Sequence, residues 1–195
     1  MKIIGVIPAR YASTRFPGKP LADIHGKPMI WWVYQQAMKV SEFDDIFVAT
    51  DDDRISSAVM SFGGNVVMTS SNHATGTDRV AEVAEKIDAD YYINIQGDEP
   101  MVEPQIIQSV INCAISHKDV HVFNLMTEIT NPVDAINPTV PKVIATESGR
   151  GIYLSRSIVP FPKGSILYNL YKQVCVYAFS PTALQFFKST QRGII

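Results

Sequence analysis

Short apolar runs alternate with helix-like patterns along most of this chain. The runs are continuous rather than alternating in polarity, which indicates strands buried on both faces of a sheet. Expected strands lie at residues 3–7, 46–49, 66–68, 91–95 and 121–126, and expected helices at 29–38, 55–62, 78–87 and 104–115. This order predicts an α/β fold, a Rossmann-like three-layer sandwich in which helices cover both faces of a mostly parallel sheet.

The pattern loosens after about Asn131, where expected strands at 140–146, 151–154 and 171–179 have no long helices between them. We therefore expect a mixed or antiparallel extension of the sheet. No repeat, low-complexity tract or linker divides the 195 residues. This continuity predicts a single domain over residues 1–195.

The charge balance excludes some classes of protein. Seventeen Lys and Arg against nineteen Asp and Glu give a net charge of −2, whereas nucleic-acid binders usually concentrate a basic excess on one face. The apolar N-terminal run is interrupted at Pro8 and Arg10, too early for a signal peptide, and no stretch reaches transmembrane length. We expect a cytoplasmic protein without nucleic-acid or membrane partners. Cys113 and Cys175 lie in apolar stretches and are expected to be buried thiols.

The loop after the first expected strand is rich in groups that bind phosphate. It places Arg10, Arg15 and Lys19 within ten residues, together with the Ser13 hydroxyl and a glycine at position 18. Guanidinium forks, a point charge and accessible backbone N–H groups are the mixture that a triphosphate needs. The alternative is a basic surface loop solvated by water. The position of the loop at the end of a strand, where ligands bind in such sheets, favours the binding interpretation.

Three further loops carry candidate site residues. Asp98 follows the expected strand at 91–95 and is placed to hold Mg²⁺, which prefers one or two carboxylates plus phosphates and water. The alternative is that Asp98 merely shapes a turn. Gly76, with neighbouring hydroxyls, precedes a helix and suits an anion or a base edge, although a helix start capped by Asp78 or Thr77 is the simpler interpretation. Arg156 follows a short strand and is a candidate for binding a substrate carboxylate. The histidines at positions 25, 73, 117 and 121 show no metal-ligand spacing and are interpreted as structural or surface residues.

Several motifs occur in an order that covers nearly the whole chain. The sequence resembles the CMP-Kdo synthetase (3-deoxy-manno-octulosonate cytidylyltransferase) family in Pro8-Ala9-Arg10, Pro17-Gly18-Lys19-Pro20-Leu21, Gly26-Lys27-Pro28-Met29-Ile30, Ala49-Thr50-Asp51-Asp52-x-Arg54-Ile55, Gly76-Thr77-Asp78-Arg79, Gln96-Gly97-Asp98-Glu99-Pro100, Val140-x-Lys142-Val143 and Tyr153-x-Ser155-Arg156-Ser157. The ordered set is far more specific than any one motif.

The resemblance implies transfer of CMP from CTP to the sugar acid Kdo with release of pyrophosphate, for lipopolysaccharide or capsule synthesis. It also implies Mg²⁺ as the cofactor and a homodimer. In the resembling roles, Arg10 and Lys19 hold the triphosphate and Asp98 holds Mg²⁺. The residues expected to bind nucleotide or sugar are Ala9, Ser13, Arg15, Thr75, Gly76, Arg79, Gln96, Arg156 and Gln173.

The sequence departs from the family pattern in three places. Thr75 stands where serine is usual, and Gln173 and Cys175 stand where histidine and glycine are usual, on a strand expected to border the sugar pocket. The family continues for roughly fifty residues beyond Ile195, with further sugar contacts and a second metal aspartate. We therefore expect residues 1–195 to bind CTP but to turn over little sugar. The alternatives are a cytidylyltransferase for another acidic sugar of sialic type, or a silent CTP-binding fragment. An uncovered apolar patch is expected at Leu184, Phe186, Phe187, Ile194 and Ile195.

Overall fold

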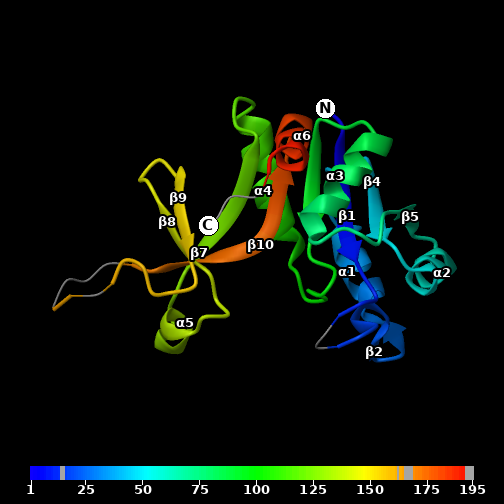
Figure 1. The fold of residues 1–195 in the computed structure, drawn as a ribbon, viewed down its shortest axis with the longest axis horizontal. Helices are drawn as coiled ribbons and strands as arrows, with labels where there is room; N and C mark the ends of the chain where they lie inside the picture. Colours follow the sequence, from blue (N-terminus) through cyan, green and yellow to red (C-terminus); the bar gives the residue numbers. More distant parts are fainter. Residues whose placement is uncertain (14–15, 162, 165–168, 192–195) are drawn as a thin grey trace. The chain divides into compact units, whose positions relative to one another are not determined.

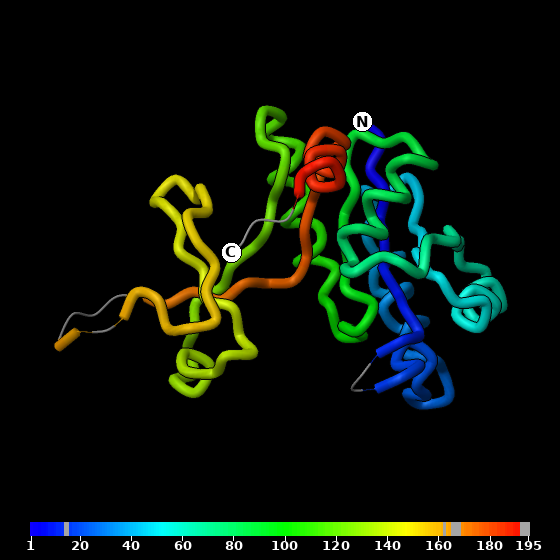
Figure 2. The backbone as a smooth tube through the Cα atoms, viewed as in Figure 1, coloured from blue at the N-terminus to red at the C-terminus, as the bar shows by residue number. Residues whose placement is uncertain are grey.

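Four parallel strands form the core of the larger part of the computed structural model, which describes residues 1–13, 16–161, 163–164 and 169–191 (Figure 1). The strands are β1 (Ile3–Ala9), β4 (Asp45–Thr50), β5 (Asn65–Met68) and β6 (Tyr91–Ile95), in the order β5-β4-β1-β6. All three neighbouring pairs are parallel. Figure 2 shows the N-terminus entering this sheet through β1, drawn in blue. The mostly parallel sheet predicted from the strand–helix alternation is confirmed.

Helices cover both faces of this sheet. They are α1 (Met29–Ala37), α2 (Asp53–Ser61), α3 (Gly76–Lys86), α4 (Pro104–Ser116) and α6 (Pro181–Ser189). Because side chains alternate along a strand, Ile4 and Val6 of β1 face one side, where they form a buried cluster with Val80 of α3 and Leu184 of α6. On the opposite side α1 and α4 contact β1, β6 and each other. The predicted three-layer arrangement is confirmed.

The extension of the sheet is antiparallel, as the sequence predicts. Val176–Phe179 at the end of β10 (Tyr171–Phe179) pair with β6. The start of β10 pairs with β8 (Lys142–Ala145), which in turn pairs with β9 (Gly151–Ser155), and β7 (Val122–Glu128) also pairs with β10.

Contacts group the chain into two compact units. The first unit comprises Met1–Phe123 and Val176–Ile195, and the second unit comprises Asn124–Cys175. The second unit holds β8, β9 and the short helix α5 (Pro132–Ile136). The single domain expected over residues 1–195 stays a prediction. No helix in the described ranges is both long and apolar enough to cross a bilayer.

Some elements were not predicted. The short η1 (Lys19–Leu21), β2 (Asp23–Ile24) and β3 (Lys27–Pro28) follow β1, the five-residue α5 precedes β8, and α6 follows the last expected strand. Helix α6 begins with an ordinary cap, because the Ser180 hydroxyl accepts from Ala183 N and Pro181 fills the first turn.

Expectations about four individual side chains can be compared with the structure. Leu184 was expected to be uncovered, which is wrong: it lies on the inner face of α6 and is buried against β1 and α3, whereas Phe186 is 68% exposed and Phe187 39%, as expected. Ile194 and Ile195 lie outside the described residues. The prediction that Cys113 is buried is also wrong, because Cys113 is exposed. The helical period of α4 turns Val110 and Ala114 inward and Cys113 outward.

Candidate functional site

Loops that follow β1, β5 and β6 line one cavity at the carboxyl edge of the parallel sheet. Its volume is about 610 Å³, within the usual range for small-molecule sites. All of its lining residues belong to the first unit. The predicted site residues around it are Ala9, Arg10, Ser13, Lys19, Thr75, Gly76, Arg79, Gln96 and Asp98. Three loops far apart in the sequence therefore converge as predicted.

The first loop is shaped by an aromatic ring. Gly18 has φ 71°, and its N–H donates to Tyr11 O at 2.8 Å. A Cβ at Gly18 would lie 2.9 Å from the Tyr11 ring, so glycine is required there for space as well as for backbone angle. The Arg54 guanidinium stacks on the same Tyr11 ring, 3.3 Å from its centroid. The guanidinium also donates two hydrogen bonds, of 2.9 and 2.7 Å, to the Asp52 carboxylate. This packing holds the Tyr11 ring against Gly18, the residue before Lys19.

The remaining predicted residues of the first loop differ in accessibility. Ala9 is buried at the end of β1, whereas Arg10 is exposed on the cavity wall. The Ser13 hydroxyl accepts from Phe16 N at 3.3 Å, which closes a turn. Arg15 lies outside the described residues. The loop thus offers Arg10 and Lys19 to a ligand.

Asp98 meets Lys19 across the cavity. Lys19 Nζ lies 2.6 Å from Asp98 Oδ2, and the two side chains are 39% and 51% exposed. The neighbouring Gly97 allows the loop after β6 to lie directly against the end of β1, because a Cβ at Gly97 would lie 2.5 Å from the carbonyl oxygen of Pro8. An ion pair this exposed contributes at most about 1 kcal/mol. It can therefore open when a ligand competes for either partner.

The carboxylates at this loop are suited to a metal that also uses ligand oxygens. Burial, and then the charge of Asp98, raise the pKa of the adjacent Glu99. Within the described part of the chain no three His, Cys, Asp or Glu side chains group closely enough to hold a metal by themselves. A single exposed carboxylate fits Mg²⁺ only when phosphate and water complete its coordination.

The loop before α3 supplies the opposite wall. Thr75, not Asp78 or Thr77, is the N-cap of α3, which begins at Gly76, two residues earlier than predicted. Thr75 Oγ1 accepts from Asp78 N at 3.3 Å, and the Asp78 carboxylate accepts from Thr75 N at 2.6 Å. The two bonds form a capping box. A Cβ at Gly76 would lie 3.4 Å from the Pro8 side chain, so the helix start sits directly against the end of β1.

Arg79 has a structural position in this wall. Its side chain is only 3% exposed, and Nη2 lies 2.8 Å from Asp51 Oδ2. Nη1 donates to Thr69 Oγ1 at 2.7 Å and to Ser70 O at 3.1 Å. The guanidinium thus joins α3 to the ends of β4 and β5. Its expected role in substrate binding stays a prediction, and its anchoring role was missed because Asp51 lies 28 residues away in the sequence.

Arg156 and Gln173 belong to the second unit. Arg156 Nη1 donates to Pro138 O and Thr139 O at 3.2 and 3.0 Å, and Gln173 N donates to Pro141 O at 3.1 Å. The buried Lys142, 1% exposed, lies beneath this turn. Its ammonium donates to the carbonyl oxygens of Asn137, Val140 and Arg156 at 2.6, 2.9 and 3.3 Å. The expected sugar contacts of Arg156 and Gln173 stay predictions.

A second cavity, of about 1,070 Å³, lies between α3 and α6 and is lined by Phe179, Phe186 and Phe187 together with polar residues of α3. It is larger than the first cavity but lacks the converging Arg10, Lys19 and Asp98. We therefore place the chemistry in the first cavity. Among the described residues, only His73 lines both cavities, although nothing in the sequence indicates a role for it beyond a structural or surface residue.

The mostly parallel sheet, with a cavity at the strand ends where Arg10 and Lys19 lie beside Asp98, is typical of an α/β nucleotidyltransferase. The cytidylyltransferase family matches residues 4–191. The chain is 49% identical over 160 residues to the 3-deoxy-manno-octulosonate cytidylyltransferase of Geobacter metallireducens, an alignment covering 82% of this chain and 63% of that protein. The same enzyme of Vibrio parahaemolyticus is 47% identical over 189 residues, covering 92% of this chain and 74% of that protein.

A solved structure shows the same fold. The structure of CMP:2-keto-3-deoxy-manno-octonic acid synthetase complexed with CTP superposes with a TM-score of 0.95 at 40% identity, covering 100% of this chain and 80% of that chain. The chain thus belongs to the cytidylyltransferase family, in the branch of the 3-deoxy-manno-octulosonate cytidylyltransferases. The resemblance inferred from the motifs is confirmed.

Proposed function

We propose that this protein transfers CMP from CTP to the sugar acid Kdo and releases pyrophosphate. The observation that carries the proposal is the Lys19–Asp98 pair, which stands beside Arg10 at the ends of β1 and β6. The names of the related enzymes and the CTP complex of the related structure support the choice of both substrates. We place the protein in the cytoplasm, where it supplies lipopolysaccharide or capsule synthesis.

Arg10 and Lys19 bind the triphosphate in this proposal. Each charge-assisted hydrogen bond to phosphate contributes about 1.5–3 kcal/mol, which exceeds the worth of the exposed Lys19–Asp98 pair. Lys19 therefore exchanges the carboxylate for a phosphate oxygen when CTP enters. The exchange neutralises phosphate charge, and the loops hold the α-phosphorus in place for attack by the sugar hydroxyl.

Asp98, released from Lys19, is the residue that we propose to hold Mg²⁺. Mg²⁺ bound there would neutralise charge on the phosphates and ease loss of the proton from the attacking hydroxyl. The carboxylate suits this ion because it is half-exposed in a cavity that a triphosphate would share.

The wall formed by Thr75 and Gly76 is proposed to select the base. Polar groups that pair with a base edge reject analogues that leave them unpaired. We further propose that Arg156 binds the carboxylate of the sugar acid, since a guanidinium fork matches that group. The glutamine at position 173 supports a sugar pocket that differs in detail from the usual family pattern.

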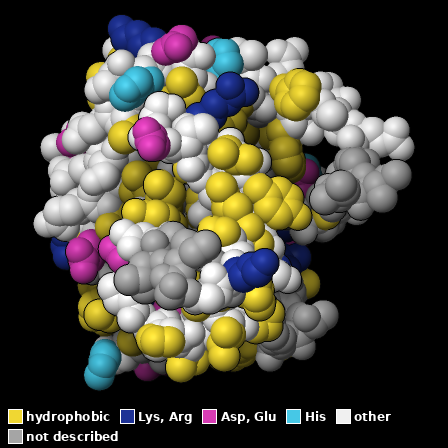
Figure 3. Space-filling view, turned by 90° about the vertical axis from the view of Figure 1, so that its left-hand side faces the viewer, with side chains coloured by type: hydrophobic (Ala, Val, Ile, Leu, Met, Phe, Trp, Pro, Cys, Tyr) yellow, Lys and Arg dark blue, Asp and Glu magenta, His cyan; other side chains and the backbone are white. Residues whose placement is uncertain are grey.

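A homodimer is also proposed. Ile152, Tyr153 and Leu154 of β9 are 62%, 52% and 51% exposed, and Phe161 is 76% exposed. Figure 3 shows one face of the molecule on which hydrophobic side chains gather with few charges among them. Exposed apolar residues on an edge strand favour association with another chain. Sedimentation of the purified protein tests this, and a monomer at all micromolar concentrations would refute it.

The central test is a titration with nucleotides followed by an activity assay. We expect CTP to bind more tightly than UTP or ATP, and pyrophosphate to be released with Kdo faster than with a sialic-type acid. Equal binding of the three nucleotides would refute the selection of cytosine. Faster release with the sialic-type acid would change the sugar, and CTP binding without any release would support a silent nucleotide-binding protein instead.

A further inference from the structure

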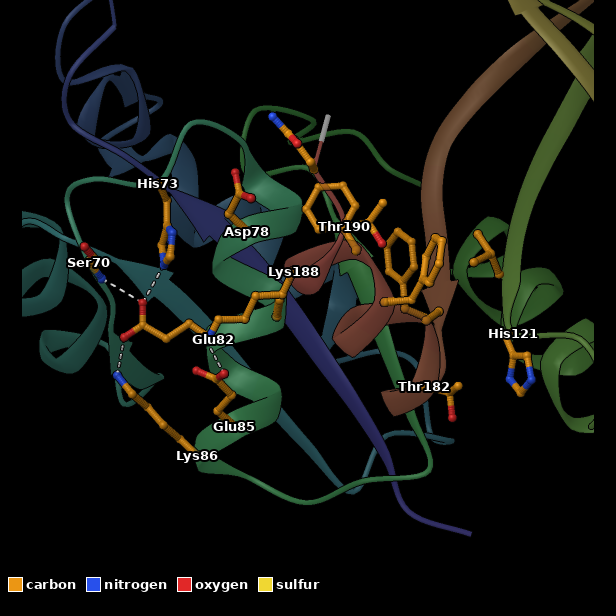
Figure 4. A pocket seen from close by; sticks show the side chains of 17 residues that line it. Ser70, His73, Asp78, Glu82, Glu85, Lys86, His121, Thr182, Lys188 and Thr190 are labelled. Carbon is orange, nitrogen blue, oxygen red and sulfur yellow. Dashed lines mark hydrogen bonds and ion pairs between the residues drawn. The ribbon is translucent and has the colours of Figure 1, made fainter. Parts of the chain in front are cut away.

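Glu82 on α3 contacts the start of the loop that precedes this helix, at Ser70, and its tip, at His73. Its Oε2 accepts from Ser70 N at 2.8 Å and from His73 Nε2 at 2.5 Å. Its Oε1 lies 2.7 Å from Lys86 Nζ, which also donates to Met68 O at 2.6 Å. Figure 4 shows His73, Ser70 and Lys86 directed at this one carboxylate. The carboxylate thus ties the start and the tip of the loop to the body of the helix.

The tip of this loop forms part of the nucleotide cavity. His73, Thr75 and Gly76 all line that cavity, and His73 is the one of the three that Glu82 holds. The start of the loop has a second anchor, since Arg79 donates to Thr69 Oγ1 and Ser70 O. At the tip of the loop, the hydrogen bond to the Glu82 carboxylate holds the imidazole of His73.

The protonation of this pair follows from the chemistry. Burial would raise the pKa of Glu82, but hydrogen bonds from Lys86, Ser70 and His73 outweigh it and lower the pKa to about 2. Glu82 is therefore ionised at neutral pH and can only accept hydrogen bonds. Because a carboxylate cannot donate, Nε2 of His73 must carry the proton of this hydrogen bond.

We propose that Glu82 is a positioning residue for nucleotide binding, which acts by fixing His73 and with it the wall of the cavity around Thr75 and Gly76. The proposal rests on the proposed function, because it takes the cavity to be the CTP site. Glu82 itself lines the neighbouring cavity between α3 and α6 and not the nucleotide cavity. Its effect on CTP must therefore pass through the loop.

The chain offers a matched control on the same helix. Glu85 is one turn away from Glu82, lines the same α3–α6 cavity and forms an ion pair with Lys188 of α6. Glu85→Gln removes a carboxylate and an ion pair from α3 without touching the loop. Glu82→Gln removes the carboxylate that fixes His73 while keeping the size of the side chain.

The test is calorimetric titration of the wild type and both variants with CTP at neutral pH, alongside urea unfolding of each protein. We expect Glu82→Gln to raise the Kd for CTP about tenfold, the effect of one lost charge-assisted bond, and Glu85→Gln to leave it within about twofold. Unfolding that shows a destabilised but folded Glu82→Gln protein with an unchanged Kd would assign Glu82 a structural role only and overturn the proposal.

A double-mutant cycle tests the route through His73. If Glu82 acts through this residue, His73→Leu weakens CTP binding by itself, and adding Glu82→Gln has little further effect. Fully additive effects would overturn the proposal, and so would unchanged binding by His73→Leu, which serves alone if Glu82→Gln does not fold. A wild-type protein that binds no CTP would instead refute the proposed function, and the inference with it.

Discussion

Substitution of Asp98 by asparagine separates three roles of one carboxylate. The fold should survive, because the lost Lys19–Asp98 pair is 39% and 51% exposed and contributes less than about 1 kcal/mol. Binding of CTP without metal should be unchanged or tighter by up to about fivefold, since Lys19 no longer needs to leave a carboxylate. Whatever Mg²⁺-dependent turnover the wild type shows, the variant should reduce it about 100- to 1,000-fold, the range for loss of one group that stabilises charge in the transition state.

The assays are thermal unfolding, calorimetry with CTP in the presence of a chelator, and pyrophosphate release as Mg²⁺ is varied. Glu103→Gln is the matched control, because Glu103 is an exposed carboxylate five residues further on whose side chain makes no cap hydrogen bond. Turnover of Asp98→Asn close to that of Glu103→Gln would remove Asp98 from the mechanism. Weaker metal-free binding of CTP would show that Lys19 does not exchange partners as we propose.

Three further predictions follow from the packing around the cavity. Asp51→Asn leaves the buried Arg79 guanidinium without its counter-ion and should lower the free energy of unfolding by about 3–5 kcal/mol; a urea midpoint near that of the wild type would contradict this. Gly97→Ala places a Cβ against Pro8 O and should weaken CTP binding at least about tenfold by separating the two strand ends, so an unchanged Kd would show that the ends can move apart freely. For Glu82, whose pKa is lowered from 4.5 to about 2, the stabilisation is complete above pH 4.5 and is lost as pH falls towards 2. The difference in unfolding free energy between wild type and Glu82→Gln should therefore shrink over that range, and a constant difference would refute the assignment.

The hydrophobic periodicity of the sequence predicted the strands and helices of the parallel sheet closely. The strand Tyr91–Ile95 was expected within its observed bounds, and α4 differs from its expected range by one residue. Helix α3 begins two residues earlier than predicted because Thr75 and Asp78 cap each other, which makes Thr75 the N-cap in place of the expected Asp78 or Thr77. The convergence of three loops could also be predicted, since the ends of parallel strands share one edge of the sheet.

The partners of the site residues could not be predicted in this way. Lys19 and Asp98 are 79 residues apart, and His73 and Glu82 meet only because the loop folds back on its own helix. A lone histidine and a glutamate on an amphipathic helix carry no local signal of such a contact. Cys113 shows the opposite error, because an apolar neighbourhood in sequence does not decide which face of a helix a residue occupies.

Lys142 gives the second unit a built-in reporter of its own opening. The Lys142 side chain is buried, and its ammonium donates hydrogen bonds to three backbone carbonyl oxygens. A reagent that acylates amines can reach it only during the fraction of time in which the turn around residues 137–140 is open, so its labelling rate measures that fraction. An exposed lysine outside both cavities, such as Lys118, would react at once and provide the internal standard. If the second unit closes on a sugar acid, the labelling of Lys142 should slow while the labelling of the standard stays the same.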